Sequence, residues 1–78
     1  MKKELAIKQI YNDFIEKMIL SDFEQEVLFR YVKNESIIKI SDELNQSAST
    51  ISRTIAQLKI KYNNYKKLEL AKLKVLDK

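Results

Sequence analysis

Residues 47–61 of this chain contain several short polar side chains, one arginine and two lysines. Arginine can donate two hydrogen bonds to guanine, and glutamine can pair in a similar way with adenine. We therefore predict that Arg53 and Gln57 contact base edges of DNA. Hydroxyl groups can contact phosphates or base edges, and lysines suit the phosphate backbone. The predicted DNA-contact set is Ser36, Ser47, Ser49, Thr50, Ser52, Arg53, Gln57, Lys59 and Lys61.

Two helices must position these side chains. Ile37, Ile40 and Leu44 repeat at helical spacing, and the same spacing resumes after a break at Ile51, Ile55 and Leu58. The pattern predicts a helix-turn-helix whose second helix, from about residue 48 to 62, can enter a major groove. The residues left facing outward on that helix are Ser49, Thr50, Ser52, Arg53, Ala56 and Gln57. The alternative is an αα-hairpin in which the two helices only pack against each other.

The residues of the break, Asn45-Gln46-Ser47, have the chemistry of a turn. Asparagine tolerates the left-handed backbone that ends many helices, and this chain has no glycine to take that place. Ser47 is predicted to cap the second helix by accepting a hydrogen bond from an early backbone amide. Ser36 is predicted to cap the first one, where the helix N-terminus also suits a phosphate.

Residues 21–62 resemble the DNA-binding domain of LuxR-type regulators and region four of bacterial sigma factors. The segment SDFEQEVLFRYV matches the helix that precedes the helix-turn-helix in those domains, and SIIKISDEL, NQS and ASTISRTIAQLKIKY match the motif itself. The chain departs from the pattern of these domains at two positions. They usually have glycine where this chain has Asn45, and an aliphatic residue where it has Gln46. The resemblance covers about half the chain and implies an isolated DNA-binding domain, because no receiver, ligand-binding or core sigma region accompanies it.

Positive charge is concentrated in the second part of the chain. Residues 1–47 have seven Lys or Arg and nine Asp or Glu, whereas residues 48–78 have eight and two. The excess of positive charge begins at the second helix of the motif, from about residue 48 to 62, which is the proposed recognition helix. Such a position is expected for a protein with a polyanion partner. The alternative is a solvated, lysine-rich surface.

The composition excludes several classes of chemistry. The chain has 78 residues and contains no Cys, His, Gly or Pro. We therefore expect no disulfide, no thiol or histidine catalysis, no glycine-rich phosphate loop, no metal and no cofactor. We predict that the protein is not an enzyme. We expect a cytoplasmic location and no membrane partner, because the sequence shows no signal peptide and no apolar run of membrane-spanning length.

The fold class expected is all-α, a small helical bundle of four to five helices that contains a helix-turn-helix, in one domain over residues 1–78. A helix is predicted over 3–19 within an N-terminal segment 1–19, with an apolar stripe of Ile7, Ile10, Tyr11, Phe14, Ile15 and Met18. Ser21 and Glu24 have the spacing of a capping box for the next helix. Residues 65–77 predict a C-terminal helix, and the sequence leaves open whether it continues the recognition helix or turns back at Asn63-Asn64. That last helix has more apolar residues than one face holds: Tyr65, Leu68, Leu70, Ala71, Leu73, Val75 and Leu76.

The sequence is compatible with three functions. The leading one is a sequence-specific DNA-binding transcription regulator or a sigma-region-four-like module, with a homodimer through the C-terminal and N-terminal helices as a further expectation. The second is a protein-binding adaptor that contacts RNA polymerase or another regulator. The third is a structural helical dimer. The partners expected are therefore double-stranded DNA, a second copy of the chain, and RNA polymerase.

Overall fold

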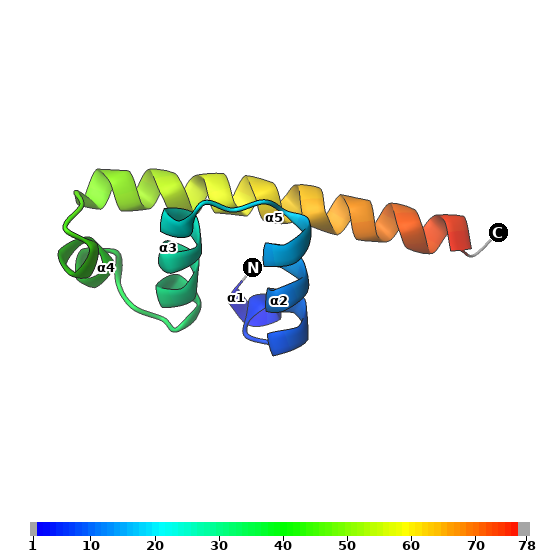
Figure 1. The fold of residues 1–78 in the computed structure, drawn as a ribbon, viewed down its shortest axis with the longest axis horizontal. Helices are drawn as coiled ribbons and strands as arrows, with labels where there is room; N and C mark the ends of the chain where they lie inside the picture. The colour runs from blue at the N-terminus through cyan, green and yellow to red at the C-terminus, as the bar shows by residue number, and fades with distance from the viewer. Residues whose placement is uncertain (1, 77–78) are drawn as a thin grey trace.

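The computed structural model describes the backbone of residues 2–76 and the side chains of residues 2–68. Within that range the chain forms helices α1 (Lys2–Leu5), α2 (Lys8–Lys17), α3 (Asp22–Val32), α4 (Ile37–Leu44) and α5 (Ala48–Leu76), and no strand. The predicted all-α fold is thus confirmed. α5 forms one long edge of the molecule, and the four shorter helices lie together on one side of it (Figure 1). No helix in the described range is both long enough and apolar enough to span a membrane.

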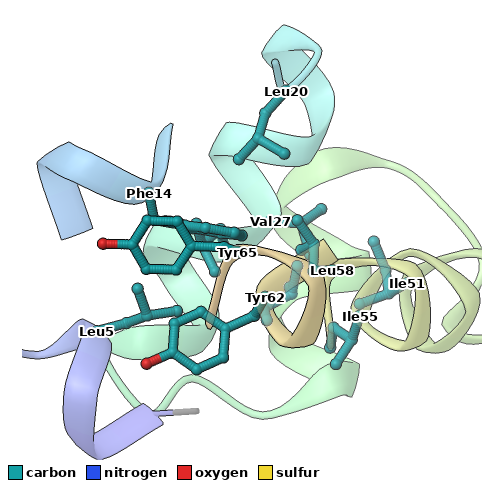
Figure 2. Packing of buried hydrophobic residues seen from close by; sticks show 11 residues of the cluster. Leu5, Phe14, Leu20, Val27, Ile51, Ile55, Leu58, Tyr62 and Tyr65 are labelled. Carbon is teal, nitrogen blue, oxygen red and sulfur yellow. The ribbon is translucent and has the colours of Figure 1, made fainter. Parts of the chain in front are cut away.

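The core fills the space between α5 and the shorter helices. Phe14, Val27 and Leu28 from α2 and α3 are fully buried, and they belong to one cluster with the inner face of α5 (Figure 2). Phe14 meets Tyr62 and Tyr65 edge to face, at centroid distances of 5.4 and 5.5 Å. Such pairs contribute about 0.5–1.5 kcal/mol beyond the area that they bury. The buried apolar residues are Leu5, Phe14, Leu20, Val27, Leu28, Ile40, Ile51, Ile55, Leu58, Tyr62 and Tyr65.

The N-terminal segment departs from the single helix expected over residues 3–19. The helix is broken at Ala6 and Ile7, and Ile7 has an extended backbone with φ −81° and ψ 117°. In one continuous helix Leu5 and Phe14, nine residues apart, would lie on opposite faces at about 100° per residue. The break lets both side chains enter the core. Ile7, predicted as part of the buried stripe, is consequently 53% exposed.

The beginning of α3 has the capping box that the sequence predicted. The Ser21 side chain accepts from the Glu24 amide at 3.1 Å, and the Glu24 carboxylate accepts from the Ser21 amide at 3.0 Å. The same carboxylate binds Lys61 of α5, so the cap also fastens α3 to the long helix.

α5 passes through Asn63-Asn64 without a break, which answers the question that the sequence left open. Leu58, Tyr62 and Tyr65 keep the inward spacing across this point, and all three are buried. Asparagine costs only about 0.7 kcal/mol or less in a helix, which is smaller than the gain from burying two aromatic rings. Leu68 is 57% exposed, and the side chains of Leu70, Ala71, Leu73, Val75 and Leu76 lie outside the described residues.

Candidate nucleic-acid interface

The turn between α4 and α5 has the geometry predicted for it. Asn45 lies in the left-handed region with φ 54° and ψ 43°. The Gln46 amide donates to the Ser41 carbonyl at 3.0 Å, and the Asn45 amide donates to the Asp42 carbonyl at 3.4 Å. These two bonds satisfy carbonyls at the end of α4 that have no partner within the helix. Three residues therefore connect the end of α4 at Leu44 to the start of α5 at Ala48 through a hydrogen-bonded turn.

Ser47 caps α5, as predicted. Its hydroxyl oxygen accepts from the Thr50 amide at 3.1 Å and lies 2.9 Å from the Thr50 hydroxyl. Both hydroxyls are therefore engaged with each other at the helix start. Ser36 has the same role for α4, where it accepts from the Lys39 amide at 3.1 Å, and it is exposed.

One side of α5 holds the helix in place. Ile51, Ile55 and Leu58 are buried in the same cluster as Ile40 of α4 and Val27 of α3. Thr54 lies on this inner side too, and its hydroxyl donates to the Thr50 carbonyl at 2.9 Å, so the buried hydroxyl has a partner. The inner face fixes which residues of α5 face solvent.

The opposite side of α5 presents the residues predicted to contact bases. Ser49, Ser52, Arg53, Ala56, Gln57 and Lys59 are all exposed in the first twelve residues of α5. Thr50 is half-buried at the flank. Arg53 has no hydrogen bond or ion pair to another described side chain, so its guanidinium is available to an external acceptor. An exposed face with one cation and several short hydrogen-bonding side chains is suited to base edges.

Lys61 has a different environment from the other predicted contacts. Its ammonium lies 2.8 Å from Glu24 Oε2 and 3.0 Å from Oε1, and the Glu24 side chain is only 14% exposed. Burial by itself raises the pKa of Glu24, but the hydrogen bonds from Lys61 and the Ser21 amide outweigh it and lower the pKa below 4.5. The structure therefore gives Lys61 an internal partner that a phosphate would have to displace.

The charge of α5 extends beyond the residues named from the sequence. No Asp or Glu occurs from residue 44 to residue 68, whereas this stretch contains Arg53, Lys59, Lys61, Lys66 and Lys67. Lys67 is exposed and lies two turns beyond the exposed Ile60, which itself lies two turns beyond Arg53. Lys66 and Lys67 are not among the DNA contacts predicted from the sequence, although they belong to the same run of positive charge. Lys66 lies 4.0 Å from Glu4, so it is partly neutralised.

Comparison with known proteins gives one informative match. The chain is 39% identical over 66 residues to the RNA polymerase sigma-H factor of Bacillus subtilis (strain 168). The match covers 81% of this chain but only 30% of the sigma factor. No family model matches the chain, and no solved structure matches it. The similarity agrees with the sigma-factor part of the expected resemblance and gives no support to its LuxR-type part.

Proposed function

We propose that the chain is a sigma-region-four-like module that binds double-stranded DNA with the N-terminal half of α5 in the major groove. The observation that supports this most directly is the exposed face of α5 over residues 48–68, a stretch without Asp or Glu that immediately follows a helix-turn-helix turn. The similarity to a sigma factor points to the same class of function, which is transcription. Basic charge and hydrogen-bonding residues then coincide on one surface.

The contacts proposed divide into two kinds. Arg53 and Gln57 read base edges, with Ser49 and Ser52 beside them on the exposed face. Ser36, Ser47 and Thr50, at the starts of α4 and α5, and Lys59 contact phosphates. We assign Lys61 to the support of the interface, because Glu24 holds its ammonium. Lys67 joins the set as an additional phosphate contact at the far end of the face.

A selection of bound duplexes from a random DNA pool tests the proposal. We expect a preferred site of a few base pairs and an affinity that falls steeply with salt, because each neutralised phosphate releases counterions. A chain that selects no sequence and binds duplex DNA without salt dependence contradicts the proposal.

A second function, as an adaptor for RNA polymerase, has an observation of its own. A groove of about 340 Å³ between α1, α2 and α3 is lined by Leu5, Ala6, Lys8, Tyr11, Phe29, Val32 and Lys33. Phe29 is 47% exposed there. None of the lining residues belongs to α5, so a protein could bind this groove while α5 contacts DNA. Substituting Phe29→Ser should abolish binding to polymerase but leave binding to the selected duplex unchanged.

A further inference from the structure

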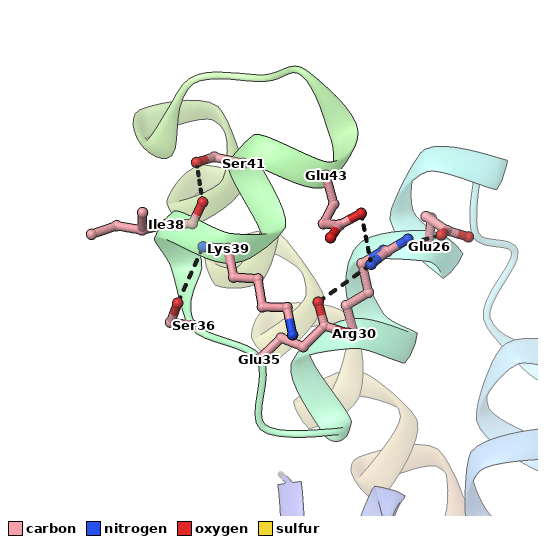
Figure 3. A network of polar contacts seen from close by, with 8 residues as sticks. All are labelled: Glu26, Arg30, Glu35, Ser36, Ile38, Lys39, Ser41 and Glu43. Atoms are coloured by element: carbon pink, nitrogen blue, oxygen red, sulfur yellow. Dashed lines mark hydrogen bonds and ion pairs between the residues drawn. The ribbon is translucent and has the colours of Figure 1, made fainter.

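Arg30 of α3 joins three elements of the fold. Its Nε lies 3.2 Å from Glu26, one turn earlier on α3, and its Nη1 lies 3.3 Å from Glu35 in the α3–α4 connection. The same Nη1 lies 3.9 Å from Glu43 in the last turn of α4 (Figure 3). One guanidinium thus faces three carboxylates, which leaves two negative charges in excess. Without Arg30 the three carboxylates would repel one another across the joint.

The backbone of Arg30 holds the same joint. Asn34 lies in the left-handed region with φ 68°. Its amide donates to the Tyr31 carbonyl at 3.0 Å, and the Glu35 amide donates to the Arg30 carbonyl at 3.1 Å. Arg30 therefore binds Glu35 through both its main chain and its side chain. The two side chains are 23% and 18% exposed, so solvent screens their ion pair less than it screens a fully exposed one.

α4 is held on two sides: Ile40 and the half-buried Leu44 pack into the core cluster that also contains the inner face of α5, and Arg30 joins α4 to α3 through Glu43. Of its eight residues only Ile40 and Ser41 are buried, and Ile38 is 70% exposed. The helix lies between two left-handed residues, Asn34 before it and Asn45 after it. A small rotation about these turns would change the angle at which the chain enters α5.

We propose that Arg30 is a positioning residue for DNA recognition: it fixes α4 against α3 and thereby sets how the N-terminal half of α5 is presented to the major groove. This inference rests on the proposed DNA-binding function. Positioning differs from a simple charge effect in one respect. Loss of a positive charge weakens binding to every duplex, whereas loss of position weakens binding to the preferred sequence.

The experiment compares Arg30→Gln with Lys33→Gln, which removes the same charge three residues away. The Lys33 ammonium lies 4.3 Å from the centre of the Phe29 ring. Affinity is measured for the selected duplex and for a scrambled duplex of equal length. Hydrogen exchange is followed at the Ile40 amide, which donates to the Ser36 carbonyl, and at α2 amides as an internal reference.

We expect Arg30→Gln to weaken binding to the selected duplex by roughly three- to tenfold more than binding to the scrambled one, the size that a network of ion pairs can reach. Hydrogen exchange at the Ile40 amide should become faster in Arg30→Gln, while exchange at the α2 amides should stay at the wild-type rate. The affinity of Arg30→Lys for the selected duplex should lie between those of wild type and Arg30→Gln, because an ammonium keeps the charge but cannot form the same fork of hydrogen bonds. Adding Glu43→Gln to Arg30→Gln should restore part of the loss by removing one repelling carboxylate.

Two results overturn the inference alone while leaving the proposed function intact. One is that Arg30→Gln and Lys33→Gln lower the affinity for both duplexes equally. The other is that wild type selects a duplex but Arg30→Gln changes neither its affinity nor the exchange at Ile40. If wild type binds no duplex at all, the proposed function fails and this role of Arg30 fails with it.

Discussion

Arg53 is the residue on which the DNA-binding proposal depends most. Its side chain is exposed in the second turn of α5, and the residues that hold α5 in the core lie on the other side of the helix. We therefore expect Arg53→Ala to weaken binding to the selected duplex by about 1–3 kcal/mol without lowering the melting temperature. Unchanged affinity in a variant with a native circular-dichroism spectrum would refute the assignment.

Lys61 should behave in the opposite way to Arg53. The ammonium of Lys61 pairs with a carboxylate that is largely shielded from solvent, and this pair joins α3 to α5. We expect Lys61→Met to lower the free energy of unfolding by about 1 kcal/mol, since a partly buried charged hydrogen bond contributes in that range. Its affinity for DNA, measured where both proteins are folded, should remain within about twofold of wild type. A normal melting temperature with a large loss of affinity would place Lys61 in the interface instead.

Asparagine provides the left-handed turns in this chain. Because the chain contains no glycine, the role of Asn45 was predictable from its place between two apolar repeats. Asn34 has the same conformation at the end of α3, although no residue pattern around it predicted a left-handed turn. Nothing in the residue types distinguishes Asn34 from Asn63 or Asn64, which lie within α5. The difference comes from tertiary packing, since the buried rings of Tyr62 and Tyr65 keep Asn63 and Asn64, which lie between them, in the helix.

The left-handed conformation of Asn45 can be tested by substitution. Asn45→Gly should keep or slightly raise the melting temperature, because glycine adopts positive φ without steric cost. Asn45→Val should lower the free energy of unfolding by about 1–2 kcal/mol, since a β-branched side chain clashes there. Chemical denaturation of the two variants beside wild type measures both effects. Equal midpoints for Val and Asn would mean that residue 45 does not need this backbone conformation.

At the scale of the element, the pairing of α3 with α5 makes stability depend on pH. The pKa of Glu24 is lower in the folded chain than its ordinary value of 4.5. The carboxylate therefore stabilises the folded state above about pH 4.5, and this contribution is lost as the pH falls through the lowered pKa. We expect wild type to lose more stability than Glu24→Gln between about pH 5 and pH 3. Urea denaturation at the two pH values measures this, and parallel losses in both proteins would contradict it.

The helices themselves were predictable to different degrees. Apolar spacing and caps gave α3, α4 and the beginning of α5, because those signals are local. The break between α1 and α2 was not predictable, since Ala6 and Ile7 are not helix-breaking residues and only the positions of Leu5 and Phe14 in the core require it. The exposure of Ser49, Ser52, Arg53 and Gln57 on one face of α5, on which the proposed DNA contact depends, was predictable from the apolar spacing. The engagement of Lys61 was not, because Glu24 is 37 residues away in the sequence.

At the scale of the whole molecule, the length of α5 bears on how many copies bind DNA. α5 has 29 residues, which corresponds to about 43 Å at 1.5 Å per residue. The molecule itself is 49 Å long, so α5 spans most of it. A single recognition helix reads only a few base pairs, and two-fold regulators place two of them about 34–36 Å apart. Arg53 and Leu68 are separated by about 22 Å along the helix axis.

We predict a homodimer in which the C-terminal part of α5 makes the contact, with Leu68 as its first exposed apolar residue. Two collinear helices meeting at Leu68 would separate the Arg53 residues by about 45 Å, which exceeds one turn of DNA. The two helices must therefore be inclined to each other if both enter one face of the duplex. Sedimentation of the full chain should show a dimer at about 50 µM, and Leu68→Glu should convert it to a monomer, because the dimer contact would then bury two charges that repel each other.

A chain shortened to remove the C-terminal part of α5 provides a second comparison. It should end at Lys67 and not at Asn64, because Tyr65 is part of the core and hydrogen-bonds to Asp13. A full-length chain that stays monomeric under these conditions would favour a module that gains its affinity from a polymerase partner.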